Sequence, residues 1–128
     1  MRDNITLTIT SLLSILLMTF HLTDDIRRGF EPGGVKTSVG SLIAAVLLYG
    51  TLALAGRRSG YIIILLGSIA GVGVPIIHMM GKGLVGGRIP NAGGVFFWVW
   101  TLLALQVTAM VSLVLSLNGL WRLGRRRA

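Results

Sequence analysis

The sequence has no cysteine and only four acidic residues. Without cysteine, the chain forms no disulfide, thiolate zinc site or cysteine-ligated iron–sulfur cluster, and it has no cysteine nucleophile. Charged residues make up 12% of its 128 residues, against about a quarter in soluble domains. Together with a hydrophobic content of 53% and a mean hydropathy of +0.81, this argues against a disordered chain or an ordinary water-soluble domain.

Sequence motifs of common enzymes are also absent. There is no serine–histidine–carboxylate order, no phosphate-binding Walker motif and no zinc-protease motif. Small multidrug-resistance transporters carry a glutamate in the middle of their first helix, and this chain has none at that place. The sequence therefore predicts no particular catalytic chemistry.

Long apolar runs dominate what is present. Four stretches, each about 18 to 23 residues long, are enough to cross a hydrocarbon core of about 30 Å. They are residues 5–23, 38–55, 61–80 and 95–117. A chain in lipid must satisfy all its backbone groups internally, which favours helices over strands here. We therefore expect an all-α integral membrane protein, with one four-helix transmembrane domain over residues 1–128.

The charges flank these runs and predict an orientation. The chain carries 12 basic residues and a net charge of +8. With four spans, the N-terminus, the 56–60 turn and the C-terminal tail share one side, and that side holds more of the basic residues. The positive-inside rule places both termini in the cytoplasm, most simply of a bacterial inner membrane. The tail residues expected to anchor on anionic lipid, rather than on nucleic acid, are Trp121, Arg122, Arg125, Arg126 and Arg127.

Small residues recur at helical spacing and predict packing faces. Gly67 and Gly71 form a GxxxG pattern in the third run. Ala104, Thr108 and Ser112 form a similar ridge in the fourth. Because lipid is as apolar as leucine, membrane helices associate through such small and polar faces.

The two histidines, His21 and His78, are predicted to lie near the same outer surface. Each shares a helix face with small or polar residues, so both should point into the bundle. Asp24 and Asp25 follow His21 at helical spacings that place at least one carboxylate beside its imidazole. Ionisable groups at a membrane boundary are costly and mark candidate functional sites. These four residues are the candidate ligands.

Several ligands suit that residue set. Two imidazoles with one or two carboxylates could bind Zn²⁺, Mn²⁺, Fe²⁺ or Cu²⁺. The histidines could instead be the axial ligands of a b-type haem, move protons, or bind a polar headgroup. In a purely structural alternative, His21 hydrogen-bonds between helices, while Asp24 and Asp25 pair with Arg27 and Arg28.

Three functions follow from these alternatives. The first is a small binding or accessory component with an outward-facing His/Asp site. The second is a metal- or haem-dependent membrane enzyme or electron carrier that uses His21 and His78. The third is a structural subunit that packs, as a homo-oligomer or in a larger membrane complex, through its glycine and serine faces.

Overall fold

The computed structural model describes residues 2–29, 39–80 and 94–125, and these residues form four α-helices. The helices are α1 (Arg2–Arg27), α2 (Val39–Leu52), α3 (Arg58–Met80) and α4 (Val95–Arg125). No strand occurs in these ranges. Three of the helices, α1, α3 and α4, are long and apolar enough to cross a membrane, and α2 is a shorter apolar helix.

Helix α2 is shorter than its predicted run, whereas α1 and α4 extend beyond theirs. Helix α2 has 14 residues and ends at Leu52 rather than at residue 55. The chain turns immediately afterwards: Leu54 N–H bonds to the Tyr49 carbonyl, and Gly56 takes a φ of 73°, which a side chain would disfavour. At 1.5 Å per residue the described helix is about 21 Å long, shorter than a hydrocarbon core of about 30 Å.

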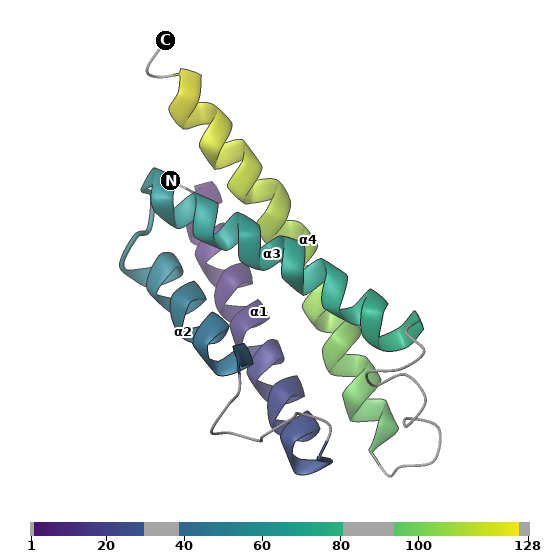
Figure 1. The fold of residues 1–128 in the computed structure, drawn as a ribbon. Coiled ribbons are helices and arrows are strands. Elements are labelled where there is room, and N and C mark those ends of the chain that lie inside the picture. The colour runs from purple at the N-terminus through teal and green to yellow at the C-terminus, as the bar shows by residue number, and fades with distance from the viewer. Residues whose placement is uncertain (1, 30–38, 81–93, 126–128) are drawn as a thin grey trace.

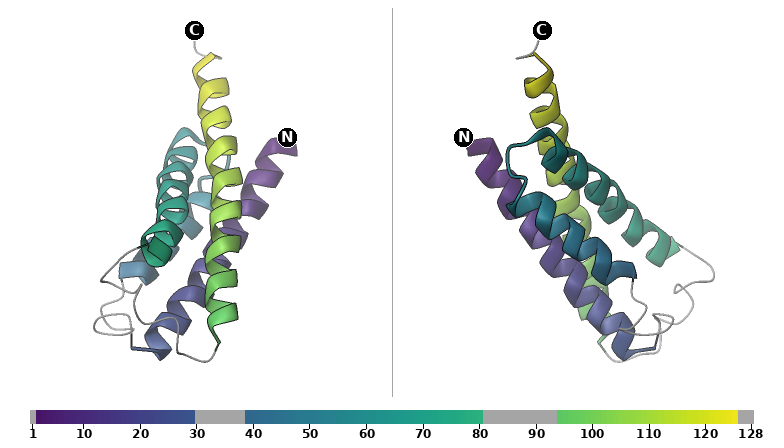
Figure 2. Two further views of the ribbon diagram at one scale, coloured as in Figure 1. Left: turned by 90° about the vertical axis from the view of Figure 1, so that its right-hand side faces the viewer. Right: turned by 60° about the vertical axis from the view of Figure 1, so that its left-hand side comes forward.

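The four helices run alternately up and down (Figure 1). Helix α4 packs along both α1 and α3, and α2 packs along the same two helices on the other side (Figure 2). Helices α1 and α3 therefore run in the same direction and face each other diagonally. This arrangement brings the C-terminal ends of α1 and α3 to one end of the bundle, together with the start of α4.

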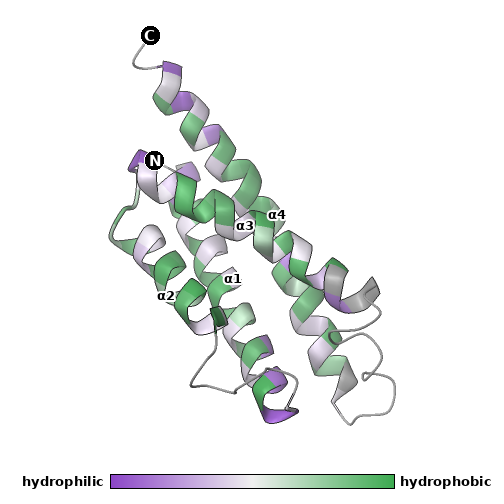
Figure 3. Ribbon diagram, viewed as in Figure 1, coloured by the Kyte–Doolittle hydropathy of each residue, from purple (hydrophilic) through white to green (hydrophobic). Residues whose placement is uncertain are grey.

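The two ends of the bundle differ in what they hold. One, here called the terminal end, contains Asp3, Arg58 and Arg122, and both ends of the described chain lie there (Figure 1). The opposite end, here called the distal end, contains Asp25 and His78. Hydrophilic residues gather at these two ends, with an apolar stretch between them (Figure 3).

The bundle has an interior of mixed apolar and polar side chains and an apolar outer surface. Its fully or nearly buried side chains include serines, threonines, a histidine and an aspartate. Large apolar side chains such as Ile9, Leu66 and Val107 are more than half exposed. A soluble protein buries such residues. The apolar outer surface is compatible with a helical membrane protein, in which such side chains would face lipid.

Hydroxyl groups join neighbouring helices in this interior. Ser11 of α1 shares a hydrogen bond of 2.7 Å with Thr51 of α2. Between α1 and α4, Ser14 donates to Thr108 at 2.8 Å, and Ser112 donates to Thr10 at 2.9 Å. Each pair satisfies two polar groups that lipid could not.

Two glycines of α3 allow it to pack closely against α2 and α4. A Cβ on Gly67 would meet Leu47 of α2, and one on Gly71 would lie 2.9 Å from the Cβ of Ala109 of α4. The two glycines of the GxxxG pattern therefore face two different helices. Ala104 of the α4 ridge is partly buried, and its carbonyl accepts a bond from the Thr108 hydroxyl.

Candidate functional site

Three helices contribute to a buried polar cluster at the distal end. His21 and Asp25 lie one turn apart on the same face of α1, and His78 comes from the last turn of α3. Trp98 and Thr101 of α4 cover them. The exposed fractions of His21, Asp25 and Trp98 are 4%, 6% and 2%. Helix α4 thus covers His21 and Asp25, whereas His78 remains partly exposed.

The two imidazoles meet, as helix direction and helical phase predict. Their ring centroids are 5.3 Å apart, with an angle of 71° between the ring planes. His21 Nε2 lies 3.3 Å from Asp25 Oδ2, and His78 Nε2 lies 3.8 Å from the same oxygen. One ligand atom from each of the three residues lies within 4.8 Å of the other two. A compact set of two nitrogens and one oxygen results.

The other ring nitrogen of each histidine is held by an acceptor. His78 Nδ1 lies 2.9 Å from the Val74 carbonyl, which can only accept, so Nδ1 carries the hydrogen. His21 Nδ1 lies 3.4 Å from Thr101 Oγ1. The Thr101 hydroxyl donates its own hydrogen to the Trp98 carbonyl at 3.0 Å, so its oxygen is left to accept from His21. In a neutral imidazole, both Nε2 atoms then present lone pairs.

Asp25 is oriented by a single strong donor. Trp98 Nε1–H donates to Asp25 Oδ1 at 2.9 Å, which leaves Oδ2 facing the two imidazoles. His21 Nε2 is buried and makes no hydrogen bond of acceptable geometry, although it lies close to Oδ2. With both histidines neutral, three lone pairs would converge without a hydrogen between them. Such an arrangement favours a cation, either a metal ion or an added proton.

Trp98 also limits what can enter the cluster. Its ring lies 5.1 Å from the His21 ring and 5.9 Å from the His78 ring, measured between centroids. A haem held by both histidines would have to place its flat macrocycle between them, in space that Trp98 and Asp25 occupy. The geometry therefore suits a small ion and not haem.

Asp24 does not join the cluster. Its Oδ2 accepts a bond of 2.7 Å from Arg28 Nε, one turn further along α1. Asp25 points inward instead and contacts no arginine among the described residues. The structural alternative, in which both aspartates pair with Arg27 and Arg28, thus describes Asp24 but not Asp25.

The tail residues at the terminal end lie apart from this cluster. Trp121 is 59% exposed, and the guanidinium of Arg125 lies 3.7 Å from the centre of its ring. Arg122 forms an ion pair with Asp3. Arg126 and Arg127 lie outside the described residues.

Two residues of the site, Trp98 and Thr101, are not predicted by the sequence reasoning. Trp98 stands among the aromatic residues Phe96, Phe97 and Trp100, a cluster typical of a membrane interface. Phe96 and Trp100 fit that interpretation, since they stack against each other and are 81% and 59% exposed. The available signal was helical spacing: Trp98 and Thr101 are three residues apart and precede the inward ridge of Thr108 and Ser112.

Searches for similar proteins add nothing to this geometry: no family model matches the chain, and no curated protein or solved structure is significantly similar to it.

Proposed function

We propose that this protein is a metal-binding protein of the membrane, in which His21, Asp25 and His78 hold one divalent transition-metal ion at the distal end. One observation carries the proposal. Three ligand atoms lie within 4.8 Å of one another in a largely buried place, and hydrogen bonds hold the other polar atoms of Asp25 and of both histidines.

The spacing of the ligand atoms favours zinc among the candidates. Zn–N and Zn–O bonds of about 2.0 to 2.1 Å at tetrahedral angles separate neighbouring ligand atoms by about 3.3 Å. The two measured separations from Asp25 Oδ2 are 3.3 and 3.8 Å. Small side-chain movements would complete the geometry. Three protein ligands leave a fourth position for water or another small ligand.

The hydrogen bonds that surround the three candidate ligands resemble those that orient the ligands of known metal sites. Metal-bound histidines usually donate their second ring N–H to a carbonyl or another acceptor, which fixes the ring. Val74 and Thr101 play that part here, and Trp98 does so for the carboxylate. The protein's own contribution is thus orientation and exclusion of lipid and water.

The location that we propose follows from charge. All four helices would cross a bacterial inner membrane with both termini in the cytoplasm, α2 being helped across by its packing against α1 and α3. The metal would then lie near the outer surface. This supports a binding or accessory function, in which the protein holds or presents a metal ion outside the cytoplasmic leaflet.

The test compares two adjacent aspartates. The full-length protein, purified in mild detergent and stripped with a chelator, is titrated with Zn²⁺ by calorimetry. We expect about one ion per chain. Asp25→Asn keeps an oxygen to accept from Trp98 but removes the anionic ligand, so affinity should fall by more than about 100-fold, beyond the 10- to 100-fold typical of outer-shell changes.

Asp24→Asn is the matched control, since it removes the same charge one residue away and should bind Zn²⁺ as the wild type does. Circular dichroism and thermal unfolding of all three proteins check that they are folded. If the wild type binds no transition metal, or if both variants bind equally well, the proposal is wrong and the cluster is a proton-sharing structural contact.

A further inference from the structure

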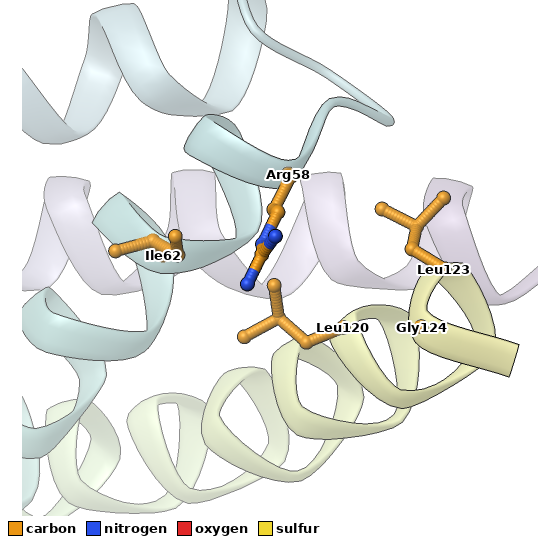
Figure 4. A pocket seen from close by; sticks show the side chains of 5 residues that line it. All are labelled: Arg58, Ile62, Leu120, Leu123 and Gly124. Atoms are coloured by element: carbon orange, nitrogen blue, oxygen red, sulfur yellow. The ribbon is translucent and has the colours of Figure 1, made fainter. Parts of the chain in front are cut away.

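A second site lies at the terminal end, far along the bundle from the His/Asp cluster. A groove between α3 and α4 has a volume of about 230 Å³. It is lined by Arg58, Ile62, Leu120, Leu123 and Gly124. In Figure 4 the Arg58 side chain extends from the first turn of α3 toward Leu120, across the space between the helices. The groove is therefore apolar, with one cation at its edge.

The charge of Arg58 has no ion-pair partner among the described residues. Arg122, also at this end, differs because it pairs with Asp3. Arg58 also begins α3, where the helix dipole adds positive potential. An anion is the group that this edge of the groove would attract.

The groove opens toward the lipid-facing surface. Ile62 is 40% exposed, and Leu117 and Trp121, which flank Leu120 on α4, are 48% and 59% exposed. An occupant that satisfies the site must combine an anionic group with hydrocarbon. A free phosphate would meet the arginine alone and leave the apolar walls uncovered.

We propose that this groove binds an anionic phospholipid. Its phosphate pairs with Arg58, and the first part of an acyl chain lies against Ile62, Leu120 and Leu123. The rest of the lipid remains in the bilayer. Basic pockets between transmembrane helices are known to favour such headgroups. The excess of 12 basic over 4 acidic residues makes the choice of an anionic lipid electrostatically consistent.

Gly124 offers a way to block the groove without removing charge. A Cβ built on Gly124 meets no atom within 4 Å, so the first atom of a larger side chain fits there without displacing a neighbour. Gly124→Leu should therefore fill part of the groove while the bundle stays folded. Arg57 offers the complementary control: it is exposed, adjacent to Arg58 and not part of the lining.

The experiment measures lipid retention by native mass spectrometry. The full-length protein in a mild non-ionic detergent is titrated with phosphatidylglycerol or phosphatidylcholine. We expect one phosphatidylglycerol to be retained in preference to phosphatidylcholine. Arg58→Gln should weaken its binding about fivefold, the factor that corresponds to one basic residue near an anionic headgroup. Gly124→Leu should weaken it at least as much, and Arg57→Gln should leave it near the wild-type value.

Three results would overturn the proposal. Equal losses in Arg57→Gln and Arg58→Gln would show diffuse attraction to the whole basic end. Unchanged binding in Gly124→Leu would show that the groove is not occupied. Displacement of the lipid by inorganic phosphate would show a headgroup site without an acyl chain. Binding of Zn²⁺ should be unaffected by all these variants, so the two proposals fail or succeed separately.

Discussion

Asp25 carries a charge in a place where helical membrane proteins rarely hold one. Its side chain is nearly buried, and its two oxygens have separate partners: Trp98 on one, the two imidazoles on the other. A buried carboxylate without compensation is costly, and a neutral imidazole compensates only by donating a hydrogen. If Val74 and Thr101 accept the Nδ1 hydrogens, the proposed metal ion or a proton added to an imidazole would supply the compensation at Oδ2.

The indole N–H of Trp98 is predicted to raise the affinity of the proposed site for Zn²⁺, because it orients the carboxylate of Asp25. Trp98→Phe keeps a ring of similar shape but removes the donor to Asp25 Oδ1, so the carboxylate can rotate. We expect Zn²⁺ affinity to fall by about 10- to 100-fold, as for other outer-shell changes. Calorimetric titration of the purified variant measures the effect.

Trp100→Phe is the control for this substitution, because Trp100 is 59% exposed and only two residues away. Its affinity should equal that of the wild type. An equal affinity in Trp98→Phe would show that the indole only fills space.

Helix direction and helical phase can both be read from the sequence, and together they predict that His21 and His78 meet. The choice between Asp24 and Asp25 could not be made in the same way. The two residues lie on either side of the direction of His21 along α1, so the position of α4 decides which one faces inward. That position depends on the packing of Trp98. An aromatic residue near a helix end can either lie at the membrane interface or pack inside the bundle, and the sequence does not distinguish the two.

At the scale of the helices, small side chains set how closely the bundle packs. The apolar runs predict α1, α3 and α4, whereas the early end of α2 depends on the turn at Gly56 and could not be read from composition. The GxxxG pattern predicts close packing but not its partner, since Gly67 meets α2 and Gly71 meets α4. The two contacts together hold α3 between its neighbours.

Gly71→Leu is predicted to destabilise the bundle. A Cβ at this position would lie 2.9 Å from that of Ala109, so a leucine would force α3 and α4 apart. Overpacking of this kind typically costs about 1 to 3 kcal/mol. The midpoint of thermal unfolding in detergent should fall accordingly.

Gly73→Leu provides the comparison on the same helix, since a Cβ on Gly73 meets nothing within 4 Å. It should unfold at the wild-type temperature or slightly above, because leucine favours helix more than glycine does. Similar unfolding temperatures for the two variants would mean that the contact with Ala109 does not limit packing.

At the scale of the whole molecule, the proposed orientation depends on the excess of basic residues expected at the terminal end. Asp3 and Arg122 pair there, and the exposed Ser59 lies in the first turn of α3 at the same end. The absence of cysteine allows single cysteines to report the side of the membrane without background. We expect Ser59→Cys to face the cytoplasm and Arg27→Cys, at the exposed end of α1, to face outward.

A membrane-impermeant maleimide applied to intact cells should therefore label Arg27→Cys and leave Ser59→Cys unlabelled until the membrane is permeabilised. Permeabilised cells should label both, which confirms that each cysteine is accessible. The opposite pattern in intact cells would place the distal cluster near the cytoplasm and reverse the proposed orientation.

The bond between Trp98 and Asp25 spans 73 residues of sequence, which has a consequence for synthesis of the chain. At about 5 to 20 residues per second, roughly 4 to 15 seconds separate the translation of these two residues. During that interval α1 is complete and the imidazole of α3 is made, but the indole donor of α4 is not yet available to Asp25. A chain without α4 would therefore leave Oδ1 of Asp25 without the donor that it has in the complete fold, and in a membrane this carboxylate would have to stay at the water boundary until α4 packs against α1.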